Sequence, residues 1–235
     1  MKMRRPADSG AAPDSLPYAQ VERVFGGRFG VAIGQRYEAI LDAGRETIAR
    51  RGYHLASIRE IARAADLSLA GLYHYVGGKD ELLFLVLDHD LDLLLRAQAA
   101  ALAAARTPEG MLLALVRTHL DFGFHHSAAL KLVNRDWELL AEPRRAEIAA
   151  KRRAYVEHGL AVLRELDRHE RSGDELLSAT NLLLGMLNGI ATRPFLRSSE
   201  DAASLAHEVA ALFLYGFLER STDRGAPAAV AGGTP

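Results

Sequence analysis

Asp121 and His125 are the residues of this sequence whose types and spacing best suit acid–base chemistry. They lie four residues apart, and in a helix they would share one face with Thr118 and Phe122. An imidazole titrates near neutral pH, so the pair could act as a general acid and base in a helical enzyme. The pair could also hold a divalent ion, but further ligands would have to come from another helix. The plainer interpretation is a few polar groups lining a partly buried bundle, and we expect neither a metal centre nor a cofactor.

A second group of polar residues lies in the stretch "SLAGLYHYVGGKDELLF", residues 68–84. Tyr73, Tyr75 and Lys79 offer hydroxyl groups and an ammonium group that suit contacts with phosphates. His74 could reach a base edge or a phosphate, and the small Ala70 would let base edges approach closely. The alternative is amphipathic packing, in which the rings are half buried and their polar tips face water.

The composition limits the class of protein. The chain has 235 residues, 49% of them hydrophobic, no cysteine and a net charge of −1. Disulfide frameworks, thiolate catalysis and cysteine-ligated zinc are thereby excluded, and contact with nucleic acid must come from a local patch. We find no apolar run of the ~18 residues that a membrane span needs and no apolar segment behind the basic start, so we expect a cytoplasmic protein that contacts no membrane.

The elements that must position these residues are all helical. Ala, Leu, Arg and Glu dominate, apolar residues recur at threes and fours, and no alternating run is long enough for a convincing strand. We expect a mobile arm over residues 1–33 and a flexible tail over residues 221–235, both rich in small residues and proline. Between them we predict nine helices, over about 35–51, 57–65, 68–75, 80–105, 107–126, 128–140, 143–169 and from about 174 and 199 onward.

The first three helices match a helix-turn-helix plan, in which the second helix of a short pair enters the major groove. Gly52 suits the left-handed end of the first helix, and Ser57 with Glu60 predicts a capping box at the start of the second. Apolar residues are spaced to close a small three-helix core: Ile58, Ile61, Ala62, Leu67 and Leu72. We therefore expect a DNA-binding domain over residues 34–79 and a larger helical domain over residues 80–220.

Residues 36–83 resemble the DNA-binding domain of the TetR/AcrR family of regulators. The similarity rests on a glycine-aromatic pair at Gly52, the Ser-Ile-x-x-Ile-Ala block from Ser57, Leu-Tyr-x-Tyr from Leu72, and the Gly-Lys-Asp-x-Leu-Leu that follows. The resemblance and the spacing together give these candidates for DNA contact: Ser57, Arg59, Ser68, Leu69, Ala70, Gly71, Tyr73, His74, Tyr75 and Lys79. Asp66 stands where the family usually has a turn glycine, and Gly71 where it usually has a Thr or Ser hydroxyl.

The resemblance also implies an all-α homodimer whose larger C-terminal bundle binds a small molecule. The segments "NRDWELLAEPRRAEIAAKRRAYVEHGL" and "LLLGMLNGIATRPF" look like a subgroup linked to fatty-acid, steroid or acyl-CoA metabolism. It implies a transcriptional repressor, not an enzyme, that a small hydrophobic effector such as an acyl-CoA thioester releases from operator DNA. The rival hypotheses are the helical enzyme with Asp121 and His125, and an interaction scaffold that binds no DNA.

Two further residue sets follow from these expectations. An apolar wall with a few convergent polar groups is typical of small-molecule sites, and the candidates are Phe122, His125, Trp137, Glu138, Arg153, Tyr155 and Asn188. Trp137 is equally consistent with a core residue, and the arginines at 152 and 153 with a solvated face. The last two helices, apolar on more than one side, give the predicted dimer interface: Leu183, Met186, Leu187, Leu205, Val209, Leu212 and Phe213.

Overall fold

The computed structural model describes residues 28–192 and 199–218. Within these ranges the chain forms nine α-helices, one 3-10 helix and one π-helix, and no strand. The predicted all-α class is therefore confirmed. Most of the predicted N-terminal arm and the whole predicted tail, residues 221–235, lie outside the described residues, but residues 28–33 of the predicted arm already belong to the first described helix.

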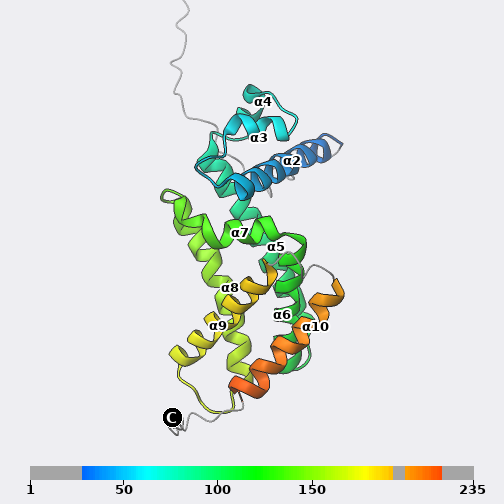
Figure 1. The fold of residues 1–235 in the computed structure, drawn as a ribbon, viewed down its shortest axis with the longest axis vertical. Coiled ribbons are helices and arrows are strands. Elements are labelled where there is room, and N and C mark those ends of the chain that lie inside the picture. Colours follow the sequence, from blue (N-terminus) through cyan, green and yellow to red (C-terminus); the bar gives the residue numbers. More distant parts are fainter. Residues whose placement is uncertain (1–27, 193–198, 219–235) are drawn as a thin grey trace, which may run out of the picture.

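Figure 1 shows a small group of helices at one end of the molecule and a larger bundle at the other, joined by α5. The elements are α2 (Arg28–Arg51), α3 (Ile58–Ala64), α4 (Leu69–Tyr73), α5 (Lys79–Ala104), α6 (Pro108–His125), α7 (Ser127–Arg135), η1 (Trp137–Leu139), α8 (Arg144–Leu166), α9 (Gly173–Ala191), α10 (Ser199–Ala211) and η2 (Leu212–Leu218). We call α2, α3 and α4 the head. The remaining helices, with most of α5, form the bundle.

The ends of the head helices follow their capping residues. Gly52 adopts φ +80° directly after α2, a left-handed conformation that side chains disfavour. Ser57 Oγ accepts a hydrogen bond from the Glu60 amide at 3.1 Å, and Ser68 Oγ accepts one from the Gly71 amide at 2.9 Å. The capping box predicted at Ser57 is only half formed, because the Glu60 carboxylate pairs with Arg50 and Arg51 on α2.

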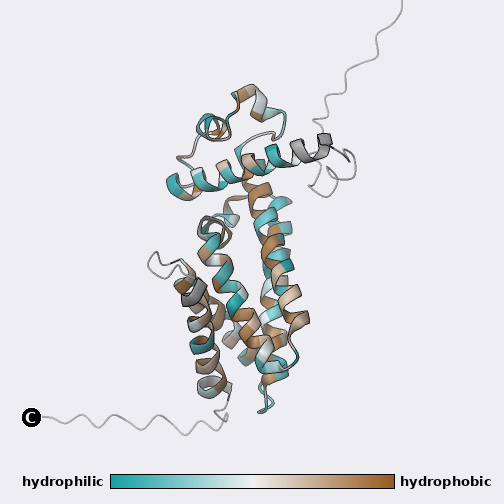
Figure 2. Ribbon diagram, turned by 90° about the vertical axis from the view of Figure 1, so that its right-hand side faces the viewer, coloured by the Kyte–Doolittle hydropathy of each residue, from teal (hydrophilic) through white to brown (hydrophobic). Residues whose placement is uncertain are grey.

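Two hydrophobic cores hold the molecule together. The head core contains Ile40, Ile48, Ile61 and Leu72, and it continues into α5 and α7. The bundle core is built from α5, α6, α7, α8, α9, α10 and η2. Figure 2 shows hydrophobic turns where the bundle helices lie together. The predicted three-helix core is confirmed, with Ile58 and Leu67 at its partly buried edge.

The helix predicted over residues 128–140 is wrong in extent. The α-helix α7 ends at Arg135, and the chain tightens into the 3-10 turn η1 before Leu140. Apolar residues continue at helical spacing through Trp137 and Leu140, and the next proline after Arg135 is Pro143. The sequence therefore carries no stop signal at Arg135. The break turns Trp137 towards α8, where Arg152 lies over its ring with 5.0 Å between the guanidinium carbon and the ring centroid.

Candidate DNA-binding surface and ligand cavity

The second short helix of the head, α4, presents a polar face to solvent. Leu72 is fully buried and fixes the orientation of the helix, whereas Ala70, Tyr73 and His74 are exposed. Ser57, Arg59 and Ser68 are also exposed, while Leu69, Gly71, Tyr75 and Lys79 are half-buried. The structure thus brings the ten predicted DNA-contact residues together around α4 and the starts of α3 and α5.

The turn between α3 and α4 contains a left-handed residue that is not glycine. Asp66 adopts φ +54°, the left-handed region in which glycine has no steric cost. Asp and Asn tolerate this region better than other side chains do. The departure at Asp66 therefore leaves the helix-turn-helix intact.

Lys79 forms a clasp between the start of α5 and the loop before α3. Its Nζ donates to the backbone carbonyls of Tyr53 at 2.7 Å, Ala56 at 3.0 Å and His54 at 3.3 Å. The same ammonium lies 4.5 Å from the centroid of the Tyr53 ring. These carbonyls occupy the three N–H groups of the ammonium, so a phosphate could be contacted only if one of them were released.

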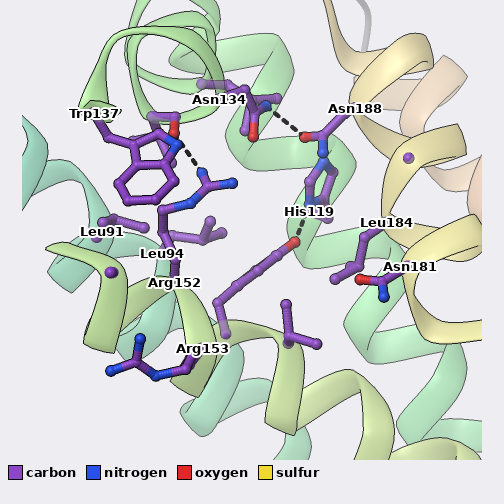
Figure 3. A pocket seen from close by; sticks show the side chains of 16 residues that line it. Leu91, Leu94, His119, Asn134, Trp137, Arg152, Arg153, Asn181, Leu184 and Asn188 are labelled. Atoms are coloured by element: carbon purple, nitrogen blue, oxygen red, sulfur yellow. Dashed lines mark hydrogen bonds between the residues drawn. The ribbon is translucent and has the colours of Figure 1, made fainter. Parts of the chain in front are cut away.

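The bundle holds a cavity of about 410 Å³ between α5, α6, α7, α8 and α9. Its apolar wall includes Leu91, Leu94, Leu130, Val133, Trp137 and Leu184. Its polar lining consists of His119, Asn134, Arg152, Arg153, Tyr155, Asn181 and Asn188 (Figure 3). An apolar wall with a few polar groups, in a volume of this size, is the usual character of a small-molecule site.

Four of the predicted ligand residues line this cavity: Trp137, Arg153, Tyr155 and Asn188. Phe122, His125 and Glu138 do not. Phe122 is buried in the bundle core, and His125 is exposed at the end of α6. Sequence reasoning missed His119 as a lining residue, although it lies among the buried apolar positions Leu115, Val116 and Leu120 of α6. A single histidine on the buried apolar face of a helix was the signal that could have identified it as a lining residue.

Two hydrogen-bonded pairs of polar side chains line the cavity, and only the pair of His119 and Tyr155 is buried. Asn134 Nδ2 donates to Asn188 Oδ1 at 2.8 Å, and His119 Nδ1 is hydrogen-bonded to the Tyr155 hydroxyl. Burial lowers the pKa of His119 to about 4, an effect that Asn188 partly opposes, so the ring is neutral at pH 7. The other ring nitrogen, Nε2, is buried without a hydrogen-bond partner among the described residues. Such an orphaned group costs about 1–3 kcal/mol.

Arg152 supplies a positive charge at the same cavity. Its Nη1 donates to the Val133 carbonyl, and its guanidinium stacks over Trp137. Burial lowers the pKa of Arg152, and Glu138 opposes that effect from beyond ion-pair distance. Arg153, the next residue of α8, is exposed. The cavity therefore combines one half-buried and one solvated cation with its polar lining.

Asp121 and His125 do not form a dyad through their side chains. His125 Nδ1 lies 2.8 Å from the backbone carbonyl oxygen of Asp121, and the Asp121 carboxylate faces Arg117 at 3.6 Å. In the part of the chain that the structure describes, no group of three or more histidine, aspartate or glutamate residues could hold a metal ion.

The predicted dimer residues differ in their exposure. Leu183, Leu187, Val209 and Phe213 are buried within the protomer, and Met186 and Leu205 are partly buried. Leu212 is 63% exposed, as are its neighbour Tyr215 at 69% and Leu182 of α9 at 68%. The sequence could not tell the two apolar sides of α9 apart. In the structure, Leu182 marks the outward side.

Two family models match the chain. The model "Bacterial regulatory proteins, tetR family" matches residues 40–86, and "Tetracyclin repressor-like, C-terminal domain" matches residues 105–192. The regulator BetI of Brucella canis is 36% identical over 86 residues, which are 37% of this chain and 43% of that protein. The chain thus aligns with less than half the length of this curated relative.

Two solved structures are similar over most of their length. A TetR-family transcriptional regulator from Bordetella parapertussis is 27% identical with a TM-score of 0.71, covering 78% of this chain and 96% of that one. AibR, solved in complex with isovaleryl coenzyme A and operator DNA, is 26% identical with a TM-score of 0.66, covering 76% of this chain and 98% of that one.

Among the described residues, no helix combines the length and the apolar character that a membrane span requires.

Proposed function

Because the chain belongs to the TetR family of bacterial regulatory proteins, we propose that it is a dimeric transcriptional repressor that a small hydrophobic effector releases from operator DNA. The observation that carries this proposal is that an exposed helix-turn-helix face lies next to the start of α5, while Leu91 and Leu94 further along the same helix line a separate cavity. Allosteric regulation requires two such distinct sites.

The head is proposed to bind DNA through α4. Ala70 and His74 lie on its exposed face, where they can approach base edges in the major groove. Tyr73 and Arg59 flank this face and are suited to phosphates, together with Ser57, Ser68 and Tyr75. Base contacts would give sequence preference, and phosphate contacts would fix the position of the helix.

The effector is proposed to be an acyl-CoA thioester. The cavity of about 410 Å³ is of a size for the acyl part, and the exposed Arg153 at its rim can meet phosphates of a nucleotide portion outside. The similarity to AibR, whose structure contains isovaleryl coenzyme A, supports the same class of ligand.

Helix α5 is proposed to couple the two sites. It begins at the Lys79 clasp in the head and lines the cavity with Leu91 and Leu94. In a dimer, the two copies of α4 would enter successive major grooves about 34–36 Å apart. An effector that prefers a different spacing would weaken DNA binding by its differential affinity for the two conformations.

The test is release of the protein from DNA that flanks its own gene. We expect a specific complex in a mobility shift assay and its dissociation by at least one member of a panel of acyl-CoA thioesters of different chain length. Free coenzyme A is the matched control and should leave the complex intact. A specific complex that no thioester dissociates would contradict the proposed effector, and the absence of a specific complex would contradict the proposed repressor.

A further inference from the structure

One buried polar atom of the cavity lining has no hydrogen-bond partner among the described residues. His119 is 1% exposed, and its Nε2 makes no hydrogen bond among the described residues. Native proteins pair nearly all buried polar atoms, and an exception needs an explanation. Figure 3 shows the His119 ring at the cavity, close to Asn188. A ligand in the cavity would supply the missing partner.

The other polar groups fix which ring nitrogen carries the proton. The Tyr155 hydroxyl makes its one hydrogen bond among the described residues with His119 Nδ1. Because the phenol proton has no other acceptor there, the hydroxyl donates to Nδ1. The neutral His119 ring therefore carries its own proton on Nε2, and this atom is a donor.

The surroundings of this donor define what can accept from it. The oxygen of Asn188 accepts a hydrogen bond from Asn134 at 2.8 Å but makes none with Nε2. The cavity wall includes the apolar side chains Leu94, Leu130 and Leu184. An oxygen carried by a largely apolar molecule would therefore satisfy this donor and match the wall.

We propose that the Nε2–H of His119 donates to the carbonyl oxygen of an acyl group, and that this contact selects acyl compounds over alkyl compounds of the same shape. This inference rests on the proposed function, because it assigns a role within the same effector cavity. An acyl thioester and a free carboxylate share the required oxygen. The positive charge of Arg152 at the cavity can accommodate either of them.

Trp137 allows ligand binding to be measured without DNA, because it is the single tryptophan of the chain and lines the cavity. Its emission is titrated with acyl-CoA thioesters of several chain lengths, with the corresponding free carboxylates, and with S-alkyl coenzyme A thioethers that lack the carbonyl oxygen. We expect the best acyl compound to bind at least about tenfold more tightly than its thioether, since an unpaired buried donor is costly. A stronger response to the thioester or to the carboxylate identifies the source of the acyl group.

Variants at His119 separate this contact from simple cavity filling. In His119→Leu, the thioester and thioether should bind within about twofold of each other, because the donor is gone. His119→Gln keeps an N–H group and should retain part of the preference. Tyr155→Phe leaves the ring in place but frees Nδ1 to hold the proton, so it should also reduce the preference, and it serves if His119→Leu does not fold.

Three results would overturn the inference: equal affinity of the wild type for acyl and alkyl compounds, no response to any acyl compound, or a preference that persists in folded His119→Leu. Operator binding is measured on the same preparations. Retained DNA binding without an acyl preference would reject the role of His119 and leave the regulator intact, whereas lost DNA binding in the wild type would reject the proposed function itself.

Discussion

Arg45 of α2 forms a buried ion pair with Asp90 of α5. The Arg45 Nε donates to both carboxylate oxygens at 3.1 and 3.0 Å, and Nη2 donates to Oδ1 at 2.6 Å. The side chains are 10% and 2% exposed. The pair joins the head to the helix that lines the cavity. It is therefore placed to transmit a movement of α5 to the DNA-binding surface.

Removing one member of this pair should destabilise the protein. Asp90→Asn leaves the guanidinium of Arg45 buried with only the exposed Asp42 as an ionic partner, and we expect a loss of about 3 kcal/mol in the free energy of unfolding. Asp92→Asn, which removes a more exposed pair with Lys151, should cost less than about 1 kcal/mol. Urea denaturation measures both. Equal effects of the two substitutions would contradict a larger contribution of the buried pair to stability.

Lys79→Ala should reveal whether the clasp or a phosphate contact matters more. The substitution removes three hydrogen bonds to the loop before α3, so we expect a loss of stability of about 2 kcal/mol. Binding to all DNA sequences should weaken through the misplaced loop, while the dependence of log affinity on log salt stays unchanged. A slope reduced by about one would instead show that Lys79 contacts a phosphate.

Arg59 and Ala70 should affect DNA binding in different ways. Arg59→Ala removes an exposed cation near the start of α3, so affinity should fall for all sequences and the salt slope should fall by about 0.9. Ala70→Val adds bulk on the exposed face of α4 and should change the preferred operator sequence. Binding to a randomised operator library gives the sequence preference, and a salt series on one operator gives the affinity and the slope. Arg96→Ala, exposed on α5, is the control that should change neither.

Acid should destabilise the protein partly through His119. Its pKa is lowered by burial from 6.5 to about 4, so between these values the unfolded chain binds a proton that the folded chain does not. Stability from this group is complete above about pH 6.5 and is lost as the pH falls towards 4, by on the order of 3 kcal/mol. His119→Gln should show a smaller loss over this window in denaturant melts. If stability falls with pH in the same way in both proteins, His119 is not the source of this acid destabilisation.

Leu182→Asp should disrupt the proposed dimer. The side chain is 68% exposed in the protomer, so a charge there should not harm the fold. If the outward face of α9 pairs with a second copy, light scattering should give half the mass of the wild type, and operator affinity should fall. Leu55→Asp, at an 80% exposed site in the head, should leave the mass unchanged. An unaltered mass for Leu182→Asp would place the interface elsewhere.

The sequence predicted the head more accurately than the bundle. Capping residues act locally, so Gly52, Ser57 and Ser68 marked helix ends that the structure confirms within a residue. The end of α7 has no such local signal, because tertiary contacts of Trp137 with α8 determine it. Likewise, the sequence showed α9 to be apolar on more than one side but could not distinguish Leu183, in the core, from Leu182, at the surface.

The cavity was predicted only in part for the same reason. Tyr155 and Asn188 come from helices distant in the sequence, and their types suggested a polar lining. The role of His119 depends on the hydrogen bond between Nδ1 and Tyr155, which lies on another helix, and on an Nε2 that has no partner among the described residues. Helical spacing placed Asp121 and His125 on one face, but only the structure shows that His125 bonds to the backbone of Asp121.

The most direct test of the regulatory function is the ratio of affinities for DNA flanking its own gene and for scrambled DNA of the same composition, measured at one fixed salt concentration. The account predicts that the purified protein binds the flanking DNA at least about a thousandfold more tightly. Equal affinities for the two DNAs would contradict a sequence-specific regulator.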